Sequence, residues 1–377
     1  VRDEKGRKMS KTRGNTIDPL ELMDRHGADA LRFTLAAMSS PGTDVALDLK
    51  RVEGYQAFGT KIWNAARFVL MNLSDEPPSE GVQFRADSEN LKLTDRWIVS
   101  RVNEVTREVD RALGEFRYDE AASALYHFFW HELCDWYIEV AKPSLVGEAR
   151  NAAESSRTRA VLLRVLDRAL RLLHPFMPFL TEEIWQLLPH EGASLVTAAF
   201  PRWREEEFDA DAEREMAFLM SVVTKLRNLR SENSLDPKKK LEVLFRSDLV
   251  RPRRLLESHG DIVRNLARLE RFEFVQEIPL DLPAARGVIT GLEMAILRSG
   301  LVDRGEERRR LSRELEKVEK ELAGVEAKLE NDAFARRAPA EIVEKVRAAQ
   351  RELAEKKERL VRTLSTLPET ELSSPPG

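Results

Sequence analysis

Hydrophobic residues recur with the period of an α-helix over most of the chain. Between residues 49 and 73, Phe58, Ile62, Ala65 and Val69 are spaced four, three and four residues apart and share one helix face. The same period predicts further helices at about 94–113, 118–142, 155–174 and 181–188. Because polar and proline-containing stretches separate these segments, residues 49–205 are predicted to form a helical bundle.

A short helical module is predicted before the bundle, in residues 1–48. Asp18 is suited to cap a helix, Pro19 fits its first position, and Glu21 can return a hydrogen bond to the cap. Gly27 permits a left-handed stop, after which residues 28–37 form a second short helix. The basic segment before Asp18 therefore leads directly into a helix with a fixed start.

A small α+β unit is predicted in residues 206–300. A helical pattern over about 210–231 is followed by alternating Leu241, Val243 and Phe245, which is the period of a half-buried strand. Another helix near 250–268 precedes two strand-like runs, FEFVQEI and ARGVITGLEMAIL.

A heptad pattern predicts a coiled-coil hairpin in residues 301–369. In the first arm, spacings of four and three alternate at Leu311, Leu315, Val318, Leu322, Val325 and Leu329. The second arm repeats every seven residues at Val346, Leu353, Leu360 and Leu367. The segment ENDAFARRAPAE interrupts the pattern, so we expect two antiparallel helices joined by a short loop, and a disordered tail at 370–377. The fold is therefore predicted to be mainly α.

Composition narrows the classes of function. The 377 residues are 42% hydrophobic and 33% charged, as in a soluble globular protein, and no apolar run of membrane-spanning length occurs, so we expect a cytoplasmic protein. The net charge of -4 leaves only local basic patches to attract nucleic acid. The one cysteine, Cys134, cannot form an internal disulfide, and its apolar surroundings favour an unreactive thiol.

Two histidines have the spacing of a zinc-binding pair. His127 and His131 lie four residues apart in HFFWHEL, but no third ligand is nearby and aromatic side chains crowd the segment. Packed, hydrogen-bonded histidines are the favoured interpretation, and we expect no metal site.

The basic segment KGRKMSKTRGN, residues 5–15, places Lys8 and Lys11 beside the hydroxyls of Ser10 and Thr12. On composition alone, a solvated loop is the favoured interpretation. The order KMSKT followed by RGNTIDP resembles the KMSKS signature loop of class I aminoacyl-tRNA synthetases. Thr12 stands where this family usually has serine, and because threonine keeps the hydroxyl we expect a mild effect.

Further motifs resemble the valine-specific members of that class. GADALRFTLA, KIWNAARFVLMNL, ELCDWYIEVAKP, LHPFMPFLTEEIWQLL and LRNLRSE occur in the family's order. The hairpin with NDAFARRAP at its tip also resembles the valyl-tRNA synthetases, which disfavours the isoleucine- and leucine-specific enzymes. The chain is thus identified as a C-terminal part of this family. The alternative is a non-catalytic tRNA-binding or coiled-coil scaffold protein.

The resemblance implies a valine–tRNA ligase, which uses ATP with Mg²⁺ to activate valine and transfers it to tRNA(Val). It makes Lys11 the main ATP-contacting lysine and Lys8 its helper, with Ser10 and Thr12 as donors. Ammonium groups on a closing loop can stabilise the charge that develops on the leaving pyrophosphate. The resemblance places the catalytic core with its HIGH signature, and the editing domain, before Val1. Alone, this chain is expected to bind tRNA but no cofactor and to be inactive, whereas the intact enzyme is expected to be a monomer.

Three surfaces are candidates for tRNA contact. Lys61, Asn64 and Phe68 share the helix face next to the core stripe, where an aromatic ring could stack on an unpaired base. A simpler interpretation is that Phe68 only widens the core contact. The anticodon-binding role of this domain in the family favours the first.

For two further basic clusters, the alternative interpretation is a solvent-exposed charged surface without a specific role. Arg227, Asn228 and Arg230 lie near a helix end and could meet tRNA phosphates. In the hairpin, acidic residues are nearly as frequent as basic ones. The family uses this arm to lean on the outer corner of tRNA, which selects Arg309, Arg313, Arg336 and Arg337 as its candidate contacts.

Overall fold

In the computed structural model of the chain, two compact units form. The described residues are 2–3, 6–73, 91–146, 152–279, 281–297 and 304–330, with single residues and pairs between 346 and 361. The first unit comprises residues 1–224 and 250–267, and the second comprises 225–249 and 268–377. The boundary falls inside a helix, and each unit is described by itself below.

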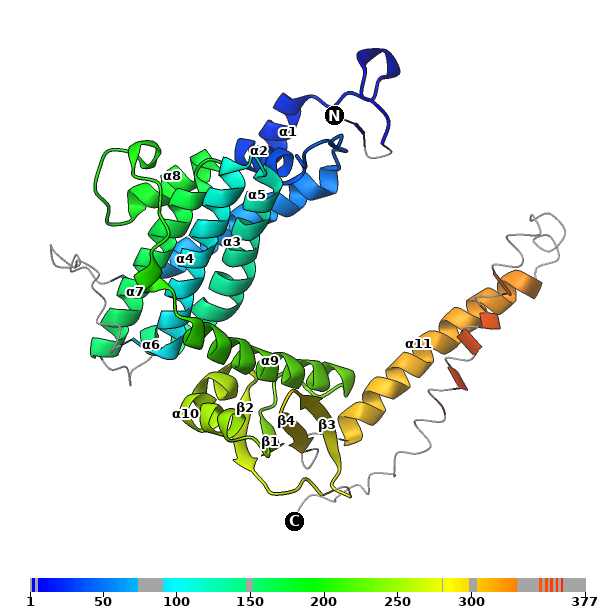
Figure 1. The fold of residues 1–377 in the computed structure, drawn as a ribbon. Helices are drawn as coiled ribbons and strands as arrows, with labels where there is room; N and C mark the ends of the chain where they lie inside the picture. The colour runs from blue at the N-terminus through cyan, green and yellow to red at the C-terminus, as the bar shows by residue number, and fades with distance from the viewer. Residues whose placement is uncertain are drawn as a thin grey trace. The chain divides into compact units, whose positions relative to one another are not determined.

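The N-terminal module has the two helices that its caps predict, α1 (Pro19–His26) and α2 (Ala28–Ala37) (Figure 1). The Asp18 carboxylate accepts a hydrogen bond from the backbone nitrogen of Leu20 at 2.9 Å, so the predicted N-cap is confirmed. Gly27 has a φ of 85°, a conformation that favours glycine, and it separates the two helices.

The bundle contains α3 (Leu49–Asn72), α4 (Leu93–Gly114), α5 (Tyr118–His127), α6 (Ile138–Leu145), α7 (Ala152–Leu173) and α8 (Pro178–Leu187). Phe58, Ile62 and Val69 of α3 are buried, which confirms the core stripe. Phe58 lies at the centre of an aromatic cluster, with its ring centroid 5.3 Å from that of Phe33 on α2 and 4.9 Å from that of Tyr126 on α5. These rings join the module to the bundle.

One predicted helix differs in its interior. The period at 118–142 predicts a continuous α-helix, but residues Phe128–Tyr137 form a π-helical segment between α5 and α6. Phe128, Phe129, Leu133 and Tyr137 are all buried, so the wider turn brings more large side chains onto the core face. This packing with the rest of the bundle outweighs the local α-helical preference.

Module and bundle are also joined by polar contacts. The Asp29 carboxylate on α2 accepts hydrogen bonds from the backbone nitrogens of Phe179 (3.3 Å) and Leu180 (2.6 Å), at the start of α8. Arg32, one turn further along α2, donates to the carbonyl oxygen of Pro175 at 3.0 Å. The proline-rich joint between α7 and α8 is therefore fixed by α2.

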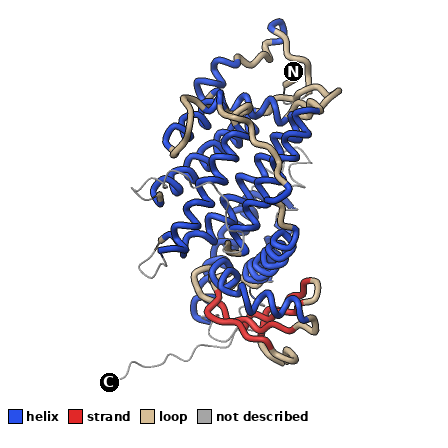
Figure 2. The backbone as a smooth tube through the Cα atoms, turned by 60° about the vertical axis from the view of Figure 1, so that its left-hand side comes forward, coloured by secondary structure: helices blue, strands red, loops and turns tan. Residues whose placement is uncertain are grey.

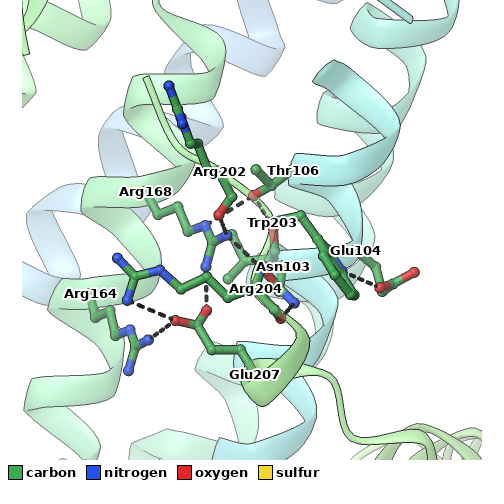
Figure 3. Close-up of polar contacts among 10 residues, drawn as sticks. Asn103, Glu104, Thr106, Arg164, Arg168, Arg202, Trp203, Arg204 and Glu207 are labelled. Atoms are coloured by element: carbon green, nitrogen blue, oxygen red, sulfur yellow. Dashed lines mark hydrogen bonds and ion pairs between the residues drawn. The ribbon is translucent and has the colours of Figure 1, made fainter. Parts of the chain in front are cut away.

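A buried polar network holds the segment after α8 against α4 and α7 (Figure 3). Arg168 on α7 donates to Thr106 Oγ1 at 3.0 Å, Asn103 Oδ1 at 2.9 Å and the carbonyl oxygen of Arg202 at 2.6 Å. Asn103 also donates to the carbonyl oxygen of Arg204 at 2.6 Å and accepts from its backbone nitrogen at 2.9 Å. The network satisfies polar groups that would otherwise be buried without partners.

Glu207 neutralises this network. It lies in a short 3-10 helix (Glu205–Glu207), and its carboxylate pairs with both Arg164 and Arg168. Burial lowers the pKa of Arg168, and the charge of Glu207 opposes that shift. Glu207 therefore keeps the buried guanidinium compensated.

The helices α9 (Ala210–Glu232) and α10 (Val250–Leu266) both lie within the predicted α+β region, 206–300. The second unit contains a four-stranded sheet of β1 (Leu241–Arg246), β2 (Leu269–Phe274), β3 (Ala284–Ile289) and β4 (Leu292–Leu297), drawn red in Figure 2. Its order is β2-β1-β4-β3, with β1 parallel to β2 and the other pairs antiparallel. Leu241, Val243 and Phe245 are buried, as their alternation predicts.

The C-terminal region contains α11 (Arg304–Glu330), in which Val318 and Leu322 of the heptad pattern are buried. The described residues between 346 and 361 are helical, and Lys357 pairs with Glu319 of α11 at 3.0 Å. This ion pair between the two helical arms agrees with the predicted hairpin. The predicted joining loop and the 370–377 tail lie outside the described residues.

Candidate functional site

The segment that contains KMSKT forms a loop ahead of α1. The Lys8 side chain is exposed, and the hydroxyls of Ser10 and Thr12 lie 3.2 Å apart. Lys11 opens a 3-10 turn (Lys11–Arg13), and its side chain lies outside the described part of the structure. Gly6 and Gly14, which flank the loop, have φ angles of 74° and 65°, which favour glycine.

Asn15 holds the two sides of this loop together. Its Oδ1 accepts from the backbone nitrogen of Ser10 at 3.0 Å, and its Nδ2 donates to Asp3 Oδ2 at 3.0 Å. Asp3 also accepts from the backbone and side-chain nitrogens of Arg7, both at 2.8 Å. The hydrogen bonds from Asn15 and Arg7 hold the pKa of Asp3 well below its usual range.

Sequence reasoning overlooked Asp3 as part of this site. Asp3 and Asn15 lie too far apart in sequence for a local pattern to indicate that they pair, although Asn15 itself belongs to the RGNTIDP motif. The loop base is also anchored to a distant segment: Arg2 donates to the carbonyl oxygen of Val45 at 2.7 Å and pairs with Asp44 at 2.6 Å. The exposed lysine is thus carried on a loop with a fixed base.

The candidate tRNA face of α3 is partly committed to contacts within the bundle. Lys61 Nζ lies 2.6 Å from Asp135 Oδ1 and 4.0 Å from the ring centroid of Trp130. Asn64 is exposed and Phe68 is half-buried. Lys61 therefore stands beside the face in a fixed position, while Asn64 and Phe68 have surface available.

Trp63 and Arg67 extend this face and were missed by sequence reasoning. Both side chains are exposed, and they alternate with Asn64 and Phe68 along the same helix. The signal that could have found them is their spacing of four residues, which places an aromatic ring and a guanidinium on one strip. Together these four residues, Trp63, Asn64, Arg67 and Phe68, are called the α3 face below.

The basic cluster at the end of α9 divides into two kinds of residue. Arg227 and Asn228 are exposed. Arg230 is only 9% exposed, and its guanidinium donates to the carbonyl oxygens of Pro237 (2.9 Å) and Arg268 (3.4 Å). Burial lowers the pKa of Arg230. The periodicity could not separate a surface arginine from one turned inward, and we leave Arg230 out of the candidate interface as a correction.

The candidate arm residues are only partly described. Arg313 of α11 is exposed. The side chain of Arg309, and all of Arg336 and Arg337, lie outside the described part of the structure.

His127 is the last residue of α5, and His131 lies in the π-helical segment. The ring centroids of His127 and His131 are 5.0 Å apart, and His131 Nδ1 lies 3.3 Å from Asp135 Oδ2. Across the described residues, no three His, Cys, Asp or Glu side chains gather in a way that could hold a metal ion. In the same residues, no helix has the length and apolar character needed to cross a membrane.

Three family models match successive parts of the chain. The model of tRNA synthetases class I (I, L, M and V) matches residues 1–48, which contain the KMSKT loop. The anticodon-binding domain of tRNA ligase matches residues 95–245. The valyl tRNA synthetase tRNA binding arm matches residues 303–368.

Curated relatives match nearly the whole chain. The valine–tRNA ligase of Syntrophotalea carbinolica is 42% identical over 362 residues, which are 96% of this chain and 39% of that protein. The Thermotoga maritima enzyme is 42% identical over 373 residues, covering 98% of this chain and 40% of that protein. The Listeria monocytogenes enzyme is 39% identical over 371 residues, 98% and 41% respectively. The chain thus spans about two fifths of the length of these relatives.

Proposed function

Because the chain belongs to the valyl-tRNA synthetase family, we propose that it is the tRNA-binding part of a valine–tRNA ligase. The observation that carries this proposal is the order of three family models along one chain: class I synthetase, anticodon-binding domain, then the valyl-specific arm. The arm favours the valine enzyme over its relatives. A non-catalytic scaffold has no comparable support.

We propose that the intact enzyme is a cytoplasmic monomer that joins valine to tRNA(Val) with ATP and Mg²⁺. ATP supplies the adenylyl group that activates the carboxylate of valine. Lys8 and Lys11 would meet its phosphates, and the exposed position of Lys8 on a loop with a fixed base suits that role. Because the base of the loop is already fixed, less conformational entropy is lost when Lys8 and Lys11 bind the phosphates.

The class I synthetase model matches residues 1–48 alone, so we expect this chain by itself to lack valine activation. Purified chain should show no valine-dependent exchange of pyrophosphate into ATP. Measurable exchange that depends on Lys11 would contradict this expectation, because it would show that the chain by itself supplies the groups needed to activate valine.

We propose that this chain by itself binds tRNA. We propose that the α3 face stacks on and reads unpaired anticodon bases, because an aromatic ring and a guanidinium can both stack on a base. Arg227 and Asn228 would meet the backbone, and Arg313 of the arm would meet the tRNA corner together with Arg309, Arg336 and Arg337.

The experiment is a gel shift of a tRNA(Val) transcript by the purified chain over a range of salt concentrations. Binding should weaken linearly on a log–log plot against salt, because phosphate contacts release counterions. Arg227→Ala and Arg313→Ala should each make the slope shallower by about one. No tRNA binding at low salt by the folded chain would overturn the proposal and leave a structural scaffold as the function.

A further inference from the structure

The first unit contains a cavity of about 360 Å³ that the proposed tRNA contacts do not use. Its walls are the first turn of α4, the last turns of α6, the start of α7 and the second half of α10. A single water needs only a small fraction of this volume, whereas small-molecule sites have volumes of this order. The cavity is therefore large enough for an organic ligand.

A buried carboxylate lines this cavity. Asp95 is 3% exposed, and one of its oxygens accepts a hydrogen bond from Tyr137 Oη at 2.7 Å. Within the described part of the chain, Asp95 has no ion-pair partner. Burial raises the pKa of Asp95, and the nearby charges of Lys92 and Arg157 only partly offset that effect. A cation in the cavity would offset it further.

A second polar side chain belongs to the lining. Thr158 on α7 also lines the cavity and is 2% exposed as a residue. A hydroxyl can accept a hydrogen bond as well as donate one. An N–H group in the cavity can therefore donate to this hydroxyl oxygen.

The remaining charges favour a positive ligand. Lys92, the one lysine of the lining, pairs with Glu154 and donates to Ser144 Oγ at 3.2 Å, so these two charges compensate each other. Asp261 adds another carboxylate, and His259 is the remaining titratable group of the lining. The rest of the wall is largely aliphatic, formed by Leu93, Val140, Ala141, Pro143, Ile262 and Leu266.

The geometry points to a binding site for a small aliphatic ammonium ion. Its charged end pairs with Asp95 and donates to Thr158, and its hydrocarbon part packs on the aliphatic wall. A metal ion fits less well, because the described residues hold no cluster of three potential ligands. This site is independent of the proposed tRNA binding.

The test is calorimetric titration of n-butylammonium into the full chain, with n-butanol as a neutral ligand of similar shape. Wild type and the control Glu108→Gln, an exposed residue on the same helix, should bind n-butylammonium saturably. Asp95→Asn should weaken binding by about tenfold or more, because it removes the charge of the ion pair. Ala141→Leu should weaken it similarly by filling the cavity while leaving every charge in place.

Circular dichroism of each variant establishes that it is folded, and Ala141→Leu keeps the test decisive if Asp95→Asn does not fold. Failure of wild type to bind n-butylammonium would overturn the inference. So would equal binding of n-butanol, since the carboxylate would then play no part, or undiminished binding by folded Ala141→Leu.

Discussion

Arg164, Arg168 and Arg204 converge on the carboxylate of Glu207, and the Arg168 and Glu207 side chains are almost wholly buried. A buried ion pair is weak evidence for stability as a whole, because desolvating two charges offsets their attraction. Removing one partner is different, since the other charge then stays buried without compensation. The segment that follows α8 therefore depends on this one carboxylate.

Glu207→Gln should lower the free energy of unfolding by about 3–5 kcal/mol, the usual cost of breaking a buried pair. Glutamine keeps the shape of the side chain but leaves the Arg168 guanidinium uncompensated. Urea unfolding measures the change, and Glu206→Gln, an exposed neighbour, is the matched control. Equal stability of the two variants would mean that the network is already balanced without Glu207.

Cys134 should be chemically inert in the folded chain. Burial raises the pKa of its thiol to about 12. The thiolate is the reactive form, so near pH 8 only roughly 10⁻⁴ of the thiol is ionised. Native protein should therefore react with a disulfide reagent far more slowly than protein unfolded in urea. Rapid labelling of the native protein near pH 8 would show that the thiol is not held in an apolar environment.

Single residues also mark what sequence could and could not supply. Asp18 could be predicted as an N-cap because the features that indicate it, a carboxylate directly before a proline, are neighbours in sequence. The structure confirms this cap. Arg227 and Arg230 look alike in sequence, yet Arg230 is turned inward to the carbonyl oxygens of Pro237 and of Arg268, which lies 38 residues further along the chain. Asp3 was invisible for the same reason, because its partner Asn15 lies across a loop.

At the scale of elements, the loop that carries Lys8 is held in place by the side chain of Asn15, which is called its tether below. Asn15 bonds both Ser10 and Asp3, so the tip of the loop is held to its base. The pKa of Asp3 lies below its usual value, so the tether contributes fully above the ordinary aspartate range, about pH 4. Below that range its contribution to stability declines, and it is lost when the pH falls through the lowered pKa at which Asp3 takes up a proton in the folded chain.

Asn15→Ala should release this loop while leaving the bundle intact. Amide hydrogens of residues 6–14 should exchange faster, because the variant loses the hydrogen bonds to Ser10 and Asp3. The amides of α4, which pack in the bundle core, serve as the internal reference. Unchanged exchange in the loop would show that the Arg2 anchor alone holds it.

Periodicity predicted the helices well because a helix that covers a core repeats its hydrophobic residues along one face. Helix α2 has the predicted bounds, and α3 ends one residue earlier than predicted. The π-helical segment escaped prediction, because hydrophobic periodicity does not separate a π-helical turn from an α-helical one when both bury residues such as Phe128 and Phe129. Strand order was likewise beyond the pattern, since alternation says which face is buried and nothing of which strands pair.

At the scale of the whole molecule, the chain combines segments that match family models of class I tRNA synthetases, of an anticodon-binding domain and of a valyl tRNA synthetase tRNA binding arm. Its net charge is -4, so any affinity for tRNA must come from local surfaces rather than from the overall field. The α3 face has the clearest chemistry among these surfaces, with exposed Trp63, Asn64 and Arg67 beside half-buried Phe68.

The central claim is that this chain recognises tRNA(Val) and reads its anticodon with the α3 face. The most direct measurement compares the dissociation constants of the chain for tRNA(Val) and for the same tRNA with its anticodon bases replaced. Wild type should prefer tRNA(Val), and Phe68→Ala should lose about 1–3 kcal/mol of binding, the worth of one base stacked on an aromatic ring. Phe116→Ala, which removes an exposed aromatic ring elsewhere in the first unit, should bind like wild type. Equal affinity of wild type for both tRNAs, or normal binding of tRNA(Val) by folded Phe68→Ala, would contradict the account.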